Sequence, residues 1–96
     1  MEETIFTKEE LSRITKDVET NTITVDVHGM TVRDSWRFCH NICALHHRDQ
    51  FSMTVIHGYL GGVSIKKALW EKPISARVQR IKSCSWNPGV TTIQVA

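Results

Sequence analysis

The stretches VDVHG at residues 25–29 and VIHG at residues 55–58 carry the same apolar-His-Gly step, and this repeat is the clearest indication of the fold. β-branched residues are frequent before both steps, which is typical of strands. A segment with helical periodicity follows each step, and glycine lets the chain turn tightly between strand and helix. The sequence therefore predicts two consecutive strand–turn–helix units.

The segments outside these two units complete an α/β pattern. Strands are expected over 22–29, 51–58, 76–83 and 90–96, and helices over 8–17, 31–49 and 64–71. Thr7 and Glu10 have the spacing of a capping box for the first helix, and the Asn-Pro-Gly at 87–89 predicts a turn. The predicted fold is a two-layer α/β sandwich with a four-stranded, mostly parallel sheet, an antiparallel last strand, a βαβαββ core and an additional N-terminal helix.

Composition restricts the class of protein. A chain of 96 residues is expected to form one domain, and no apolar run approaches the roughly 20 residues that a membrane span needs. The acidic start MEETIFTKEE has neither the basic nor the apolar region of a secretory signal. Three cysteines, an odd number, favour a reducing compartment. We therefore expect a cytoplasmic protein with no membrane contact.

Charge is unevenly distributed along the chain. Residues 1–30 hold seven acidic and three basic residues, a net charge of −4, whereas residues 31–96 hold three acidic and nine basic residues, a net charge of +6. A basic body behind an acidic leading segment points to a polyanionic partner. The alternative is a solvated surface with no partner.

The two His-Gly steps are expected at the same edge of the sheet. Right-handed crossovers place both turns at the carboxyl ends of the strands, where open α/β sheets bind ligands. His28 and His57 should therefore line one crevice. Asp26 shares a strand face with His28 and could orient its imidazole or help to hold a cation, and the imidazole could move a proton in phosphodiester cleavage. The alternative is structural, with the histidine bonded to backbone and the aspartate capping a loop.

The second turn, HGYLGGVSIKK, is rich in glycine. Glycines before a helix allow backbone N–H groups to point at an anion, and Lys66 and Lys67 could add positive charge. Tyr59 would be exposed in this turn and could stack on a base or sugar. The spacing matches neither a P-loop nor a dinucleotide fingerprint, and a plain turn is the alternative.

Three segments taken together resemble the Smr (small MutS-related) domain family. VDVHGMTVRDSWRF resembles its leading motif, VIHGYLGGVSIKKAL resembles its His-Gly-x-Gly-x-Gly motif, and NPGVTTIQV resembles its last turn and strand. The resemblance covers about residues 23–95. In the second motif, Tyr59 and Leu60 stand where the family has a small or basic residue and then glycine, and Gly61 and Gly62 follow.

The resemblance implies a two-layer α/β domain over 23–96, preceded by an acidic helical segment over 1–22. Smr domains are associated with binding of DNA or RNA, and several members with endonuclease activity that is sometimes dependent on a divalent metal. The residues that match the two motifs are Asp26, His28, Gly29, His57, Gly58 and Gly62.

These features lead to a set of expected roles. His28 or His57 would carry a proton, and Asp26 would orient the imidazole or bind Mg²⁺ or Mn²⁺. The residues expected to bind phosphate or nucleic acid are Gly29, Arg33, Gly58, Tyr59, Gly61, Gly62, Lys66 and Lys67. The chain is thus expected to bind nucleic acid, as an endonuclease or as a module without catalysis. A third alternative is an adaptor whose acidic N-terminal segment contacts another protein.

Overall fold

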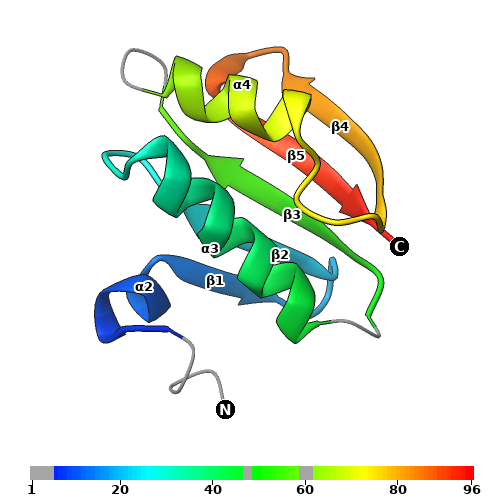
Figure 1. Cartoon of the computed structure of the whole chain (residues 1–96). Coiled ribbons are helices and arrows are strands. Elements are labelled where there is room, and N and C mark those ends of the chain that lie inside the picture. The colour runs from blue at the N-terminus through cyan, green and yellow to red at the C-terminus, as the bar shows by residue number, and fades with distance from the viewer. Residues whose placement is uncertain (1–5, 47–48, 59–61) are drawn as a thin grey trace.

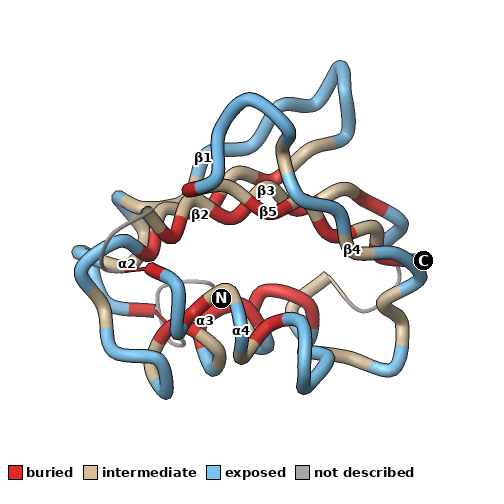
Figure 2. Tube along the Cα trace, turned by 90° about the horizontal axis from the view of Figure 1, so that it is seen from above, coloured by how far each residue is buried: buried red, intermediate tan, exposed pale blue. Residues whose placement is uncertain are grey.

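The computed structural model of the chain describes residues 6–46, 49–58 and 62–96, and it has two layers (Figure 1). The helices are α2 (Lys8–Ser12), α3 (Val32–Leu45) and α4 (Val63–Glu71). The strands are β1 (Ile14–Asp17), β2 (Thr22–Asp26), β3 (Phe51–Ile56), β4 (Val78–Cys84) and β5 (Asn87–Val95). Helices α3 and α4 cover one face of the sheet, and the other face carries no described helix (Figure 2). The predicted α/β class is confirmed.

The sheet has the strand order β1-β2-β3-β5-β4. Among the described strands β2 and β3 form the one parallel pair, and the other three pairs are antiparallel. Because β5 lies between β3 and β4 and is antiparallel to both, β4 still runs in the same direction as β2 and β3. The prediction of a four-stranded, mostly parallel sheet is therefore wrong in two details, since the sheet has five strands and one parallel pair among those described. The βαβαββ order and the antiparallel last strand are confirmed.

The fifth strand comes from the N-terminal segment. The capping box is present, because the Thr7 hydroxyl accepts from the Glu10 N–H (3.1 Å) and the Glu10 carboxylate accepts from the Thr7 N–H (2.9 Å). The expected helix over 8–17 nevertheless ends at Ser12. Ile14 and Thr15 are β-branched, and they pair with Val25 and Thr24 of β2 instead of continuing the helix. The division of the chain at residue 22 stays a prediction.

Alternation along the strands builds the core. Val25 of β2 and Met53 and Val55 of β3 are fully buried against the helices, and each is flanked by partly exposed residues. Phe38 of α3 and Leu69 of α4 fill the space from the other layer. The opposite sheet face carries mainly polar side chains, although Ile56 and Val90 also lie on it. No helix in the described part of the chain is long and apolar enough to cross a membrane.

The turn between β4 and β5 lies earlier than the Asn-Pro-Gly sequence predicts. Cys84 pairs with Asn87, so Ser85 and Trp86 form a two-residue turn and residues 87–89 belong to β5. Pro88 is tolerated in the strand because the pairing of β5 with β3 begins only at Val90.

Candidate functional site

The two His-Gly turns are neighbours at one edge of the sheet. The Val27 N–H donates to the Ile56 carbonyl (2.9 Å) and so extends the β2–β3 pairing beyond the strands. A Cβ atom on Gly58 would lie 3.7 Å from the Cβ of His28. Both Gly29 (φ +80°) and Gly58 (φ +82°) have the left-handed conformation that favours glycine. The turns therefore meet as the crossover geometry predicts, and α3 and α4 both begin beside them (Figure 1).

The two histidines, however, do not share a crevice. The pairing of Asp26 with Ile56 sets His28 opposite Gly58 and His57 opposite Val27, one position apart. His57 therefore continues the buried face of β3, and 1% of it is exposed. His28 continues the other face of β2, and 67% of its side chain is exposed. The prediction that both imidazoles open onto one crevice is wrong for His57, because strand alternation turns its side chain into the core.

His28 and Asp26 form a close pair on the exposed side. The Nδ1 atom of His28 lies 2.5 Å from Oδ1 of Asp26, and the His28 N–H donates to the same oxygen (3.2 Å). Burial raises the pKa of Asp26, but the hydrogen bonds from His28 and the positive charge of Arg13 outweigh burial and lower this pKa below its ordinary value. Asp26 therefore stays ionised and holds the His28 ring by its Nδ1 atom.

Arg13 supports this pair from β1's side of the sheet. Its Nη1 donates to the backbone carbonyls of Asp26 (3.1 Å) and His28 (3.2 Å), and its Nη2 lies 3.4 Å from the Glu9 carboxylate. Nothing in the local sequence around Arg13 signals this role, because the contact depends on the pairing of β1 with β2.

The buried His57 ring has partners on both nitrogens. Its Nδ1 lies 2.8 Å from the Gly58 carbonyl oxygen, which can only accept, so Nδ1 carries the hydrogen. Its Nε2 then accepts from the Thr91 hydroxyl of β5 (2.9 Å). The N–H groups of His57 and Gly58 both donate to the Gly89 carbonyl. This arrangement fixes the turn after β3 against β5, which is a structural role and leaves no ring nitrogen for a substrate.

Gly62 closes the second turn at the start of α4. A Cβ atom there would lie 2.0 Å from the His57 carbonyl oxygen and 2.2 Å from that of Gly58, so only glycine fits. The Gly62 carbonyl accepts the first helical hydrogen bond, from the Lys66 N–H (2.9 Å). Tyr59 and Gly61, both predicted to bind nucleic acid, lie outside the described residues.

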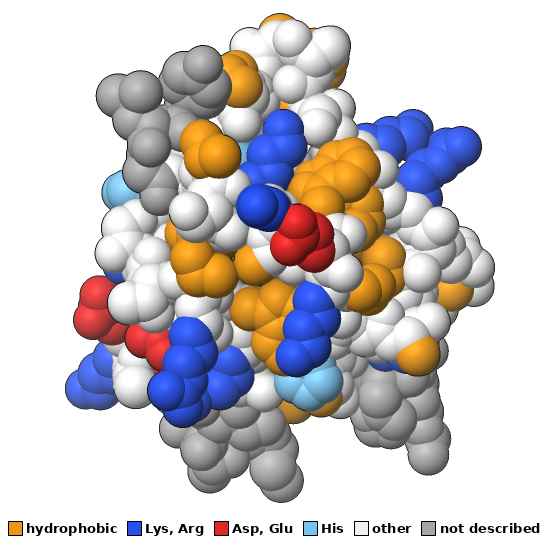
Figure 3. Space-filling view, turned by 45° about the horizontal axis from the view of Figure 1, so that its top comes forward, with side chains coloured by type: hydrophobic (Ala, Val, Ile, Leu, Met, Phe, Trp, Pro, Cys, Tyr) orange, Lys and Arg blue, Asp and Glu red, His pale blue; other side chains and the backbone are white. Residues whose placement is uncertain are grey.

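The predicted cationic residues differ in their surroundings. Arg33 is exposed in the first turn of α3 and lines a groove of about 350 Å³ between α3 and α4, together with Trp36 and Lys72. Lys66 is half-buried, whereas Lys67 is exposed, and the Nζ atom of Lys67 lies 3.9 Å from Oε1 of Glu71. On the side of the molecule shown in Figure 3, Lys and Arg side chains lie among hydrophobic ones, and Asp and Glu side chains lie between them.

Asp26 offers a metal ion one carboxylate of the protein. Within residues 6–46, 49–58 and 62–96 no group of three or more His, Cys, Asp or Glu side chains could hold a metal ion. Asp26 is a single carboxylate, and one of its oxygens already accepts from His28. The expectation that Asp26 binds Mg²⁺ or Mn²⁺ therefore stays a prediction.

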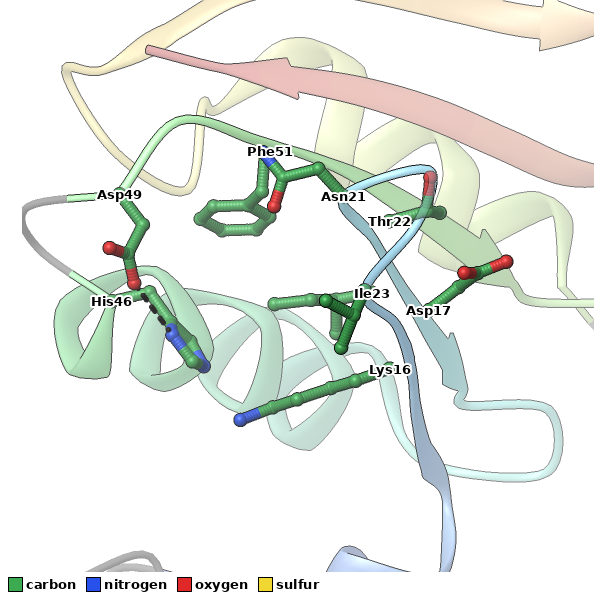
Figure 4. Close-up of a pocket in the computed structure, with 9 residues that line it drawn as sticks. Lys16, Asp17, Asn21, Thr22, Ile23, His46, Asp49 and Phe51 are labelled. Atoms are coloured by element: carbon green, nitrogen blue, oxygen red, sulfur yellow. Dashed lines mark hydrogen bonds and ion pairs between the residues drawn. The ribbon is translucent and has the colours of Figure 1, made fainter.

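A smaller pocket lies at the other end of the strands. It encloses about 170 Å³, and Ile23, Phe51 and His46 line its wall (Figure 4). His46 already has partners within the protein, since its Nδ1 lies 3.1 Å from Oδ2 of Asp49 and its ring packs edge-to-face with the Phe51 ring. Lys16 extends along this pocket (Figure 4), and its pairing with Ile23 sets it three positions along β2 from Asp26.

Comparison with known proteins agrees with this geometry at the level of the fold. No protein-family model matches the chain, and no curated protein matches it by sequence. Among solved structures, the Smr domain of Thermus thermophilus MutS2 is similar, with a TM-score of 0.55 and 20% sequence identity. The alignment covers 76% of this chain and 96% of that domain. The chain therefore has an Smr-like fold.

Proposed function

We propose that this chain is a nucleic-acid-binding domain and that its binding edge is the one that carries the two His-Gly turns. The observation that supports this most directly is that the exposed His28, the two left-handed glycines and the first turns of α3 and α4 all lie at one edge. The Smr-like fold supports the same function.

The binding edge offers suitable groups for a phosphate backbone. Helix N-termini present N–H groups with positive polarity, and Gly62 provides no side chain that would satisfy those of α4. Arg33 and Lys66 stand in the first turns of α3 and α4, and Lys67 follows. Tyr59 and Gly61, which the sequence predicts to bind nucleic acid, stay part of this proposal.

Removing one cation from this edge is expected to weaken binding in a salt-dependent way. Lys66→Ala and Arg33→Ala should each lower affinity several-fold and reduce the slope of log K against log salt by about 0.7–0.9, the contribution of one phosphate contact. Fluorescence anisotropy with labelled DNA and RNA over a salt series measures both quantities. Lys16→Ala is the matched control, since Lys16 lies in the pocket at the opposite end, and it should leave the slope unchanged. A wild-type chain that binds no nucleic acid at about 0.05 M salt would contradict the proposal.

The Asp26–His28 pair favours a second candidate function, phosphodiester cleavage. Asp26 engages Nδ1, so Nε2 of the exposed His28 is the nitrogen that would accept a proton from an attacking hydroxyl or water. Ionised Asp26 would stabilise the imidazolium that results.

This second candidate predicts a distinct response to substitution. His28→Ala should reduce cleavage of labelled DNA or RNA by about 100-fold or more, the usual contribution of a general base, and Asp26→Asn should reduce it less. Gel assays with and without Mg²⁺ or Mn²⁺ measure the rates. Cleavage that is equally fast in His28→Ala would exclude the pair as its source, whereas binding without cleavage in the wild type would leave the binding function alone.

A further inference from the structure

The open face, defined here as the sheet face without helices, carries two regular rows of polar side chains beside a third row that contains Ile56 and Val90. Strand pairing aligns one row across all five strands, consisting of Thr15, Thr24, Thr54, Thr92 and Lys82. It aligns a second row consisting of Asp17, Thr22, Ser52, Gln94 and Arg80. Neither helix α3 nor helix α4 covers these rows, because both pack on the other face (Figure 2). The open face therefore offers hydroxyl and amide groups to a ligand.

The β4–β5 hairpin adds a hollow to one end of the open face. A cavity of about 620 Å³ lies between hairpin and sheet, and its lining residues are Thr54, Lys82, Ser83, Cys84, Ser85, Trp86, Asn87, Val90, Thr92 and Gln94. Trp86, at the tip of the hairpin, is 86% exposed. A large aromatic side chain that no described residue covers, next to such a hollow, is a feature of binding surfaces.

We propose that this hollow binds single-stranded nucleic acid and that the Trp86 indole stacks on an unpaired base. The proposal rests on the nucleic-acid-binding function above and adds a second contact surface and a class of ligand. Unpaired strands expose the faces of their bases, and aromatic side chains stack on them regardless of sequence. Thr54, Thr92 and Gln94 would hydrogen-bond to the edges of the base.

Charge favours a nucleic acid over a neutral ligand or a basic peptide. None of the ten lining residues is acidic, and Lys82 is one of them. Arg80 follows in the neighbouring row, and neither cation has an ion pair with any residue that the structure describes. The two cations would contact phosphate groups, and the exposed indole would stack on the face of a base. The amide groups would hydrogen-bond to the edge of a base.

The hollow is also continuous with the proposed binding edge. Val90 lines the hollow and pairs with Ile56, which pairs with Asp26. Two strand spacings, about 10 Å, therefore separate Val90 from Asp26 across the sheet. A single-stranded nucleic acid with one base stacked on Trp86 can thus extend along the protein surface toward the Asp26–His28 pair.

The test compares Trp86→Ala with Trp70→Ala. Trp70 is a second exposed tryptophan, 42% exposed, but it belongs to α4 on the helix side. Anisotropy is measured with labelled 12-nucleotide single strands of DNA and RNA and with a duplex of the same sequence. Trp86→Ala should bind the single strands about 10-fold more weakly or worse, which corresponds to one lost stacking contact, and should bind the duplex as the wild type does. Trp86→Phe should retain most of the affinity, and Trp70→Ala all of it.

Each outcome of this test decides the proposal separately from the proposed function. If Trp86→Ala binds single strands like the wild type while Lys66→Ala loses affinity, the hollow is not the site and the binding edge stands. If Trp86→Ala weakens single strands and duplex equally, preference for unpaired bases is overturned. Lys82→Ala, compared with Lys16→Ala, should reduce the salt slope for single strands by about 0.7. An unchanged slope for Lys82→Ala would remove the phosphate contact from the proposal.

Discussion

Gly62→Ala is expected to lower the free energy of unfolding by about 3 kcal/mol or more, because the new methyl group has no space. Its Cβ would lie 2.0 Å from the His57 carbonyl oxygen and 2.2 Å from that of Gly58, and both oxygens belong to backbone. To relieve this overlap, the backbone of His57 and Gly58 and the first turn of α4 have to move apart. Urea unfolding followed by circular dichroism measures the loss.

Gly29→Ala is the matched control for this substitution. A Cβ atom on Gly29 has nothing within 4 Å, so alanine there meets only the strain of a left-handed φ of +80°, about 1–2 kcal/mol. Both glycines lie between a strand and the helix that follows it, and yet the two substitutions should differ clearly in their cost in stability. Gly62 has a φ of −106°, which other residues also adopt, so equal losses in the two variants would show that the turn relieves the backbone overlap at little cost.

Gly62→Ala is also expected to weaken nucleic-acid binding in the fraction that remains folded. The start of α4 supplies part of the proposed binding edge, and its N–H groups would move with Gly62. Anisotropy at a temperature well below the midpoint of unfolding separates this effect from loss of the fold.

The sequence predicts correctly that the two His-Gly turns are neighbours, because the rule depends only on two strand–helix units in series. It also places Asp26 and His28 on one strand face, where they are in contact. The alternation of Phe51, Met53 and Val55 further indicates the inward direction of His57, since His57 is the next residue of that series. The His-Gly dipeptide, which is the same at both positions, does not indicate this difference between the two histidines.

Other features depend on pairing between distant strands and have no local signal. β1 forms because Ile14 and Thr15 find partners in β2, although the preceding capping box starts a helix. β5 enters between β3 and β4, so that the last strand of the chain is internal. The polar rows of the open face exist only in this strand order. The polar rows could therefore not be predicted from the sequence, although the sequence does show the tryptophan at position 86.

His57→Ala is expected to reduce the stability of the protein without removing its affinity for nucleic acid. The substitution leaves a cavity in the core and deprives the Gly58 carbonyl and the Thr91 hydroxyl of their partner, with a combined cost of about 2–4 kcal/mol. Thr91→Val removes the hydroxyl alone at nearly the same volume and should cost about 1–2 kcal/mol. Urea unfolding of both single variants and the double variant measures these values.

The double-mutant cycle tests the contact between His57 and Thr91 directly. Because the Thr91 hydroxyl has lost its acceptor in His57→Ala, adding Thr91→Val to that variant should cost less than it does in the wild type. His28→Ala should show the opposite pattern, with near-normal stability and reduced binding or cleavage, since its ring is exposed. If His57→Ala kept wild-type stability but lost binding or cleavage, the ring would have to reach a substrate, and its burial against Thr91 could not describe the functional state.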